Sequence, residues 1–320
     1  MNKTQRHHDR GYPRRNVLAG FAVAAGALAA TGLKQTAAHA DPATTAAGVQ
    51  QLRLLDGAIT GRYRLADRSH AGAPLIVYLH GGGSSSAEAD IPGHSQLELS
   101  AVHGYSAFAP DRPGYGGSAS LNVPDDSDDG LFDANAARLD DAIAEIWRTW
   151  SSDCSGVVIH GSSIGGAVAL TLIARWAAGN RRGENRWPLL GLGVCDIGQQ
   201  PRPYATDLWH ALPDVQTLSL GGSSIVRPEL LEITGAWPRG NWARVSSEVP
   251  VPVYYRLARN DQLWVENNTL TKQFADSLRT RSPRVDAAVM DDGAFHPIPK
   301  SPAADPYNAQ FMDFVAGLTA

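Results

Sequence analysis

Residues 157–166 carry the pattern in this sequence that is most directly linked to chemistry. The short β-branched run at 157–159 predicts a buried strand. The motif G-x-S-x-G follows at residues 161–165, with Ser163 at its centre. Small residues around a serine permit the sharp strand-to-helix turn that exposes a nucleophile. The Ala- and Leu-rich run at 167–178 predicts a helix whose N-terminal amides favour negative charge at the turn. An ordinary glycine-rich turn is the alternative interpretation.

Strand and helix patterns alternate along the rest of the chain and must position this turn. Two runs at 51–59 and 62–66, separated by Thr60-Gly61, predict a β-hairpin. Further short strands are expected at 75–79, 106–109, 189–194, 251–257 and 285–290. Helices are expected at 96–103, 139–150, 167–178, 270–280 and 309–318. Two leading strands followed by strand–helix units predict an α/β fold with a largely parallel sheet covered by helices.

The first 40 residues resemble a bacterial twin-arginine export signal rather than part of a fold. The pair Arg14-Arg15 precedes an apolar stretch at 17–33, and residues 38–40, Ala-His-Ala, match an A-x-A cleavage pattern. A transmembrane anchor is the alternative, but the stretch is short and interrupted by glycines. We therefore expect a mature domain of residues 41–320 that is exported to the periplasm or the medium.

The charge balance argues against two classes of partner. The whole chain has a net charge of −4, and its first 40 residues hold six basic residues and one acidic residue. An acidic mature protein without basic clusters is a poor candidate for binding nucleic acid or anionic membranes. We expect neither nucleic-acid binding nor stable membrane association after signal cleavage, and the sequence leaves the oligomeric state open.

The two cysteines predict neither a disulfide nor a metal site. Cys154 precedes the strand that leads to Ser163, whereas Cys195 lies near the end of the next strand. In parallel neighbours these positions lie at opposite ends of the sheet, about 17 Å apart and beyond disulfide reach. Neither cysteine has a partner at metal-ligand spacing. The acidic run at 125–130 lacks the Glu that a calcium loop needs at its twelfth position, where Ala136 stands.

Four stretches, in this order, resemble the α/β-hydrolase family over residues 50–320. His-Gly-Gly-Gly at 80–83 is similar to the family's oxyanion loop, and Asp-Arg-Pro-Gly-Tyr-Gly-Gly-Ser at 111–118 to its loop after the fourth strand. Residues 161–165 match its nucleophile elbow, and a late Asp followed by a His matches the order of its triad. The resemblance implies the α/β-hydrolase fold and a serine hydrolase that uses no cofactor. We expect the 111–118 loop to be structural.

The chemistry needs a base for the serine and a carboxylate that orients this base. His296 is the candidate base because, among the histidines after residue 40, it alone follows the last predicted strand and precedes the final helix. The family pattern implies Asp261 as the acid, although an aspartate that caps a turn or helix would look the same. Asp196, immediately after the preceding strand, is the second candidate, and Glu266 is the third.

A tetrahedral intermediate carries an oxyanion, which preorganised N–H donors must meet. The resemblance implies the amide of Ile164, the residue after the nucleophile, and an amide of the 80–83 loop. Gly82 is the expected second donor, and Gly83 is the alternative. His80 and His160 flank glycine turns, and we expect them to have structural roles.

Residues from about 198 to 248 interrupt the strand–helix alternation with an irregular segment that contains Trp209, Trp237 and Trp242. The family inserts a cap over the site at this place, so the resemblance implies a cap here. We expect Trp237 and Trp264 to bind substrate by lining an apolar acyl or aryl pocket. Packing in the core is the alternative.

These residues predict hydrolysis of a small-molecule carboxylic ester through an acyl-enzyme. A serine nucleophile argues against epoxide and haloalkane chemistry, for which an aspartate is expected. A proline-releasing aminopeptidase is the nearest competing activity, because Glu229 and Glu232 in the predicted cap could hold a substrate amine. The 80–83 loop, however, lacks the proline that such enzymes usually show after the glycines. A perhydrolase, a C–C bond hydrolase and a non-catalytic binding protein would also be compatible with these residues.

Overall fold

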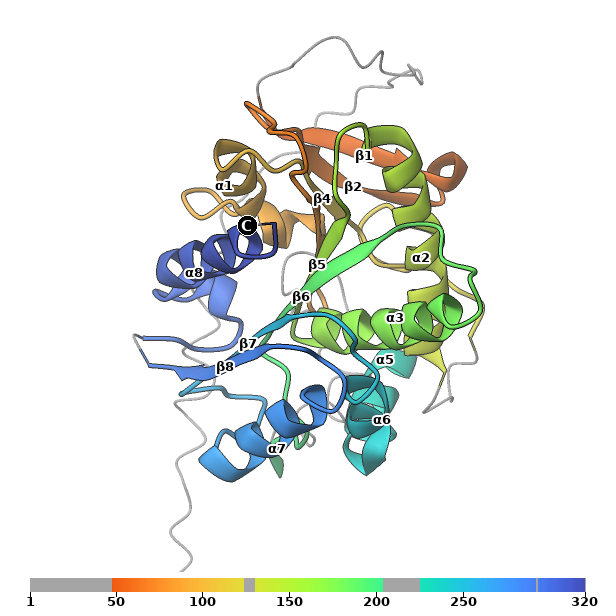
Figure 1. Cartoon of the computed structure of the whole chain (residues 1–320). Helices are drawn as coiled ribbons and strands as arrows, with labels where there is room; N and C mark the ends of the chain where they lie inside the picture. The colour runs from red at the N-terminus through yellow and green to blue at the C-terminus, as the bar shows by residue number, and fades with distance from the viewer. Residues whose placement is uncertain (1–47, 124–129, 204–224, 292, 320) are drawn as a thin grey trace, which may run out of the picture. The chain divides into compact units, whose positions relative to one another are not determined.

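The computed structural model describes residues 48–123, 130–203, 225–291 and 293–319. The predicted export signal, residues 125–129 of the acidic run and Trp209 lie outside these ranges. The described residues contain one eight-stranded sheet, in the order β1-β2-β4-β3-β5-β6-β7-β8 (Figure 1). Its strands are β1 Gln50–Leu54, β2 Ile59–Arg64, β3 Leu75–Leu79, β4 Ala107–Pro110, β5 Val157–Ser162, β6 Leu189–Cys195, β7 Val253–Ala258 and β8 Val285–Met290. Strand β2 runs antiparallel to both β1 and β4, and the other neighbours are parallel. The mostly parallel sheet is therefore confirmed.

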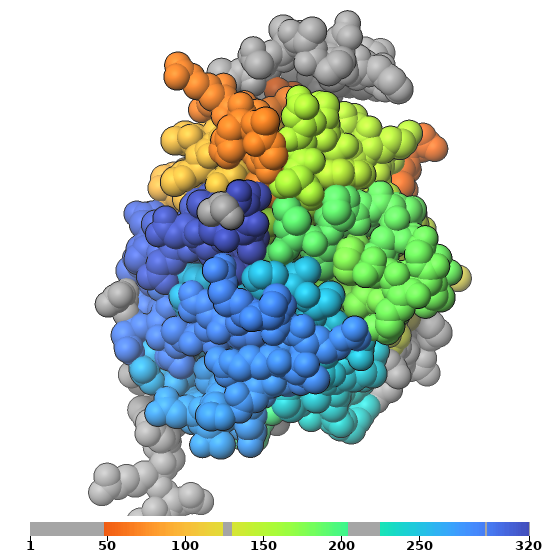
Figure 2. Space-filling model, in the orientation of Figure 1, coloured from red at the N-terminus to blue at the C-terminus, as the bar shows by residue number. Residues whose placement is uncertain are grey.

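Helices cover both faces of this sheet. They are α1 Gln96–Val102, α2 Leu131–Trp150, α3 Ile164–Asn180, α5 Arg227–Thr234, α6 Trp242–Ser246, α7 Asn268–Leu278 and α8 Ala304–Ala316. Helix α6 contacts both α3 and α7, and Figure 2 shows the three next to one another as cyan, green and blue surfaces. Helix α8 begins five residues before the predicted start at 309, because Pro306 lies in the first turn, where no amide donor is needed. None of the helices in the described ranges combines the length and apolar character needed to cross a bilayer.

Two hydrophobic layers form because successive side chains of a strand point to opposite faces. Val77 of β3 belongs to the hydrophobic cluster that includes residues of α2, α3 and α7, whereas the neighbouring Ile76 and Tyr78 belong to the cluster that includes residues of α1 and α8. All five residues of β3 and all six of β5 are buried, as expected for central parallel strands. The carboxyl ends of these strands therefore have rigid support from both sides of the sheet.

The predicted hairpin exists, but its turn lies elsewhere. Strands β1 and β2 are joined at Leu55–Gly57, where three consecutive residues have positive φ. Gly61 instead lies inside β2, opposite Pro110 of β4. A Cβ at Gly61 would lie 2.2 Å from the carbonyl oxygen of Ala109. This glycine therefore permits two strands to approach each other closely, a contact that sequence spacing does not reveal.

Residues 227–246 of the predicted cap are mostly helical rather than irregular. Helix α5 buries Pro228, Glu229, Glu232 and Ile233, which lie on one helical face, and it packs on α2. A π-helical turn at Trp237–Asn241 leads into α6, which packs on α3. Residues 204–224 lie outside the described ranges, so a cap over the site stays a prediction.

Both cysteines are free, as predicted. Cys154 precedes β5, and Cys195 is the last residue of the parallel strand β6. The two thiols therefore lie at opposite ends of neighbouring strands.

We expect Gly61→Ala to destabilise the fold by about 3 kcal/mol, because the added carbon would overlap the backbone of β4. Urea unfolding measures the change. Gly317→Ala is the matched control, since its Cβ would lie 3.5 Å from the nearest carbonyl oxygens, an ordinary contact. We expect the control to change the free energy of unfolding by less than about 0.5 kcal/mol. Equal stability of the two variants would contradict the close approach of β2 and β4.

Candidate active site

Ser163 lies at the turn between β5 and α3 with a strained backbone, at φ 53° and ψ −126°. Two glycines make this conformation possible. A Cβ at Gly161 would lie 2.5 Å from the carbonyl oxygen of Gly165, and one at Gly165 would lie 2.3 Å from the carbonyl oxygens of Leu79 and His80. The turn therefore has the strand–turn–helix context that the G-x-S-x-G pattern predicts.

The fold brings Ser163, His296 and Asp261 together from three separate loops. Ser163 Oγ lies 2.9 Å from His296 Nε2, and His296 Nδ1 lies 3.0 Å from Asp261 Oδ2. The second carboxylate oxygen of Asp261 accepts the amides of Leu263 and Trp264, both at 2.8 Å. The side chain of Asp261 is fully buried, and that of His296 is 8% exposed. The carboxylate is thus held by the backbone in the one orientation that also bonds the imidazole.

Of the three candidate acids, Asp261 is the one that bonds the histidine. Asp196 lies nearby, but its Oδ2 accepts the amide of Ile298 at 2.8 Å. Its Oδ1 has no hydrogen-bond partner among the described residues. Glu266 instead pairs with Arg259 at 3.0 Å. Asp196 is therefore a second buried carboxyl beside the pair of His296 and Asp261.

Ligand atoms of Asp196, Asp261 and His296 all lie within 4.8 Å of one another, which is close enough for a metal ion. However, His296 Nδ1 and Asp261 Oδ2 already bond each other. The other oxygen of Asp261 and one oxygen of Asp196 accept backbone amides. This arrangement fits a proton relay that starts at Ser163 better than it fits a cation site.

The buried carboxylates set the protonation of the site. Burial lowers the pKa of His296. The charge and hydrogen bond of Asp261 raise this pKa, as do the charges of Asp196 and Glu88. The raising effects are larger, so the pKa of His296 lies above its ordinary value. For Asp196, burial and the charge of Asp261 raise the pKa to about 7, against the opposing effect of His296. The charges of Asp196 and His296 therefore each affect the pKa of the other group.

The loop at 80–83 lies directly over Ser163 and Ile164. A Cβ at Gly81 would lie 3.2 Å from Ser163 Cβ, and one at Gly82 would lie 2.7 Å from Ile164 Cδ1. The amide of Gly81 is already used, because it donates to Glu88 Oε1 at 3.1 Å. The amides of Gly82 and Ile164 donate no hydrogen bond within the described part of the chain. These two amides are thus available to an oxygen atom bound at Ser163.

The residues predicted to be structural have internal partners. His80 Nε2 accepts the amide of Arg112 at 2.9 Å, and the His160 ring contacts the hydroxyl of Tyr307. Burial lowers the pKa of each histidine to about 3, so both rings are neutral near pH 7. In the 111–118 loop, Asp111 accepts the amide of Ser86 at 2.7 Å.

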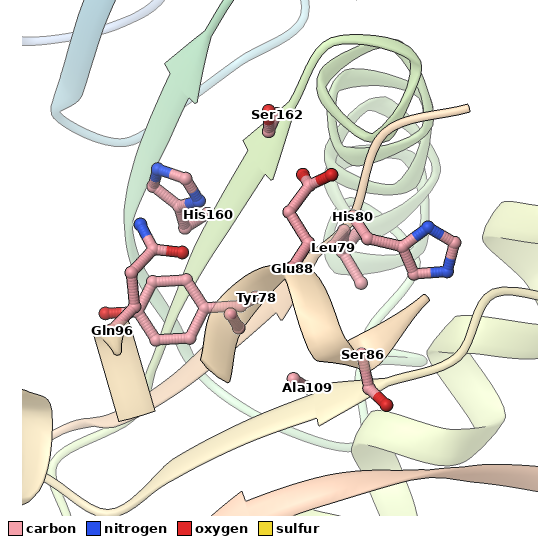
Figure 3. Close-up of a pocket in the computed structure, with 10 residues that line it drawn as sticks. Tyr78, Leu79, His80, Ser86, Glu88, Gln96, Ala109, His160 and Ser162 are labelled. Carbon is pink, nitrogen blue, oxygen red and sulfur yellow. The ribbon is translucent and has the colours of Figure 1, made fainter. Parts of the chain in front are cut away.

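Sequence reasoning missed Glu88, which follows the loop at 80–83. Its side chain bonds the amide of Gly81 and lies 3.3 Å from Lys300 Nζ. Burial raises the pKa of Glu88, yet Lys300, His80 and the hydrogen bonds lower it overall to about 2. Figure 3 shows this carboxylate directed toward Ser162 across a small cavity of about 10 Å³, the size of about one water molecule. The signal in the sequence that could have revealed Glu88 was a charged residue just after a glycine-rich loop.

Trp237 and Trp264 are both fully buried in the hydrophobic core. The Trp237 indole donates to the carbonyl of Gly198 at 2.8 Å and contacts Phe132 edge-on. Trp264 donates its backbone amide to Asp261, and its ring lies against Gly198. Their described contacts are those of core residues that support the site, and contact with a substrate stays a prediction.

The carboxylates of Glu229 and Glu232 are not free to hold a substrate amine. Glu229 is fully buried and bonds Arg112 and Tyr115. Glu232 is 1% exposed and accepts the amide of Phe132 at 2.9 Å. The interpretation of these two residues as amine ligands was therefore wrong, because both are satisfied inside the protein.

Comparison with protein families agrees with this geometry. Residues 76–315 match the family described as the alpha/beta hydrolase family. The chain belongs to the alpha/beta hydrolase family. A search of curated proteins found no match.

Several solved structures described as esterases have a similar fold. A carboxyl esterase from Bacillus coagulans aligns with a TM-score of 0.63 and 14% identity, over 86% of this chain and all of the esterase. An esterase from Pyrococcus furiosus aligns with a TM-score of 0.59 and 14% identity, over 90% of this chain and 97% of the other. An esterase from Thermogutta terrifontis aligns with a TM-score of 0.55 and 16% identity, over 85% of this chain and all of the other. At such identities the similarity concerns the fold.

We expect Asp196→Asn to lower the pKa of His296, because it removes a negative charge that stabilises the imidazolium. NMR titration of the histidine measures this. Glu266→Gln is the matched control, since Glu266 pairs with Arg259, and it should leave the His296 titration unchanged. An unshifted titration in the Asp196 variant would contradict the proposed coupling.

The same variant tests stability against pH. The folded-state pKa of Asp196, about 7, lies above the ordinary value of 3.8. The proton of Asp196 therefore stabilises the fold below about pH 4, and this contribution is lost as the pH rises through 7. We expect the stability of Asp196→Asn relative to wild type to increase between these pH values.

Proposed function

We propose that this alpha/beta hydrolase cleaves carboxylic esters through an acyl-enzyme formed on Ser163. The observation that supports this most directly is the continuous relay from Ser163 through His296 to Asp261, at 2.9 and 3.0 Å. The relay lies beside two backbone amides with no acceptor of their own in the described chain. A nucleophile, a base, an orienting acid and oxyanion donors are the groups that acyl transfer requires.

The reaction then follows from the geometry. Ser163 Oγ attacks the ester carbonyl carbon while His296 Nε2 takes its proton. Asp261 stabilises the resulting imidazolium through Nδ1, and the amides of Gly82 and Ile164 stabilise the oxyanion. His296 donates the proton to the alkoxide as the alkoxide departs, and the acyl group stays bound to Ser163 Oγ. His296 then takes a proton from water, whose oxygen attacks the acyl carbonyl carbon. The bond between this carbon and Ser163 Oγ breaks, the carboxylic acid product leaves, and His296 returns the proton to Ser163 Oγ.

An ester substrate is favoured over a peptide with a free amine. The two glutamates that supported an aminopeptidase are engaged with Arg112, Tyr115 and Phe132. Several proteins of similar fold are described as esterases, among them those from Bacillus coagulans and Pyrococcus furiosus. A perhydrolase or C–C bond hydrolase would use the same residues, and substrate profiling separates these activities.

We expect Ser163→Ala to reduce kcat for p-nitrophenyl acetate and butyrate by at least about 10⁴-fold, because the nucleophile is lost. Ser162→Ala is a matched control: its Oγ has no partner among the described residues, and it should keep nearly full activity. Turnover of prolyl-p-nitroanilide in place of the esters would establish the aminopeptidase instead. Equal ester turnover in wild type and the Ser163 variant would contradict the proposed nucleophile.

We also propose that the chain is exported by a twin-arginine type signal, on the basis of Arg14-Arg15 and the A-x-A pattern at 38–40. Exported protein is then expected to begin at Asp41, which N-terminal sequencing measures. Replacing both arginines with lysine should leave the precursor in the cytoplasm, whereas Arg10→Lys, outside the pair, should not. Export of the double variant at the wild-type level would contradict this signal type.

A further inference from the structure

Arg112 is a fully buried arginine that contacts the oxyanion loop at several points. Its Nε donates to the carbonyl oxygen of His80 at 2.9 Å, and its Nη2 donates to that of Gly81 at 3.1 Å. Its backbone amide also donates to His80 Nε2 at 2.9 Å. One residue from the loop after β4 therefore bonds two consecutive peptide carbonyls of the loop after β3.

These bonds determine where the next amides point. In a trans peptide, the carbonyl oxygen and the following N–H point in opposite directions. When the Gly81 carbonyl is turned to Arg112, the amide of Gly82 is turned away from it. The His80 carbonyl is also held by Arg112, and the following amide, that of Gly81, donates to Glu88. The guanidinium and the carboxylate thus hold opposite sides of the same peptide chain.

Such a restraint matters because glycine has the widest backbone freedom of any residue. Residues 81–83 are all glycine, so the loop itself supplies little stiffness. An oxyanion hole, however, is effective only when its donors are oriented before the reaction. The orientation must therefore come from side chains. The His80 imidazole contacts the Gly81 carbonyl oxygen through Nδ1 at 2.8 Å, and side chains outside the loop supply the other bonds.

Arg112 is itself held by a segment far away in the sequence. Glu229 of α5 accepts from the guanidinium with one carboxylate oxygen and from the hydroxyl of Tyr115 with the other. Both side chains of the ion pair are fully buried. The Tyr115 hydroxyl also accepts the amide of Val226, next to the start of α5. This cluster connects the oxyanion loop to α5, a helix from a much later part of the chain.

We propose that Arg112, oriented by Glu229, is a positioning residue that directs the Gly82 amide toward the oxyanion formed on Ser163. The proposal rests on the proposed ester hydrolysis for its kinetic consequences. Arg112 does not touch the reacting atoms. It acts through the backbone of His80 and Gly81.

The first test compares Arg112→Lys with wild type. Lysine keeps the charge but not the planar fork, and cannot bond two carbonyls and Glu229 in the same way. We expect kcat for p-nitrophenyl acetate to fall about 10²-fold, the size of effect seen when an oxyanion donor is lost, with KM changed less than about threefold. Affinity for a trifluoromethyl ketone, which forms an oxyanion on the serine, should fall in parallel with kcat.

The matched control is Arg256→Lys. Arg256 is also nearly buried and also bonds two backbone carbonyls, those of Tyr255 and Asp286. Neither carbonyl belongs to the oxyanion loop, so this variant should keep the wild-type kcat and inhibitor affinity. Glu229→Gln serves as a milder second variant, because it keeps the shape of the cluster and removes one charge. It should lower kcat by about 10-fold, which lies between the fall expected for Arg112→Lys and the unchanged wild-type value.

Hydrogen exchange tests the restraint without any substrate. The peptide that contains residues 80–83 should exchange faster in Arg112→Lys and Glu229→Gln than in wild type and Arg256→Lys. This result would support the positioning role even if the wild type proved to hydrolyse no ester, which would overturn the proposed function alone. Unchanged exchange at residues 80–83 would overturn the role of Arg112. So would a loss of activity that matches the loss of folded protein, if the folded molecules bind the inhibitor as tightly as wild type does.

Discussion

The close approach of the turn at Ser163 to the end of β3 is the constraint on which the rest of the site depends. The backbone at Ser163 is strained, and the carbonyls of Leu79 and His80 leave room for no side chain at Gly165. This packing places the serine, the oxyanion loop and the first amides of α3 within a few ångströms. Strain of this kind persists because both strands are buried on both faces of the sheet.

The relay is a second consequence of burial. The buried carboxylate of Asp261 has hydrogen-bond partners for both oxygens, two backbone amides for one and the imidazole for the other. Asp196, with one oxygen unpartnered among the described residues, has only part of this support, and its pKa is accordingly raised to about 7. Two carboxyls at the ends of neighbouring strands thus have different roles, which follow from hydrogen bonding rather than from residue type.

The oxyanion loop shows the same dependence on distant partners. Its glycines let the backbone approach Ser163, but they cannot orient an amide by themselves. Arg112 holds its carbonyls and Glu88 holds one of its amides, so two buried charges of opposite sign restrain a flexible loop. Glu229 completes the arrangement from a helix that sequence analysis assigned to an irregular cap.

Local sequence patterns by themselves determined much of this protein. Apolar runs and small-residue turns predicted the strands, and strand β8 has the predicted bounds. The resemblance to the α/β-hydrolase motif order implied that Ser163, Asp261 and His296 would meet, and the structure brings these three side chains together. Only the tertiary structure decided that Gly61 lies between strands, that Glu229 is an internal ion-pair partner and that Arg112 holds the oxyanion loop. These outcomes depend on contacts between residues far apart in the chain, and local spacing carries no information about such contacts.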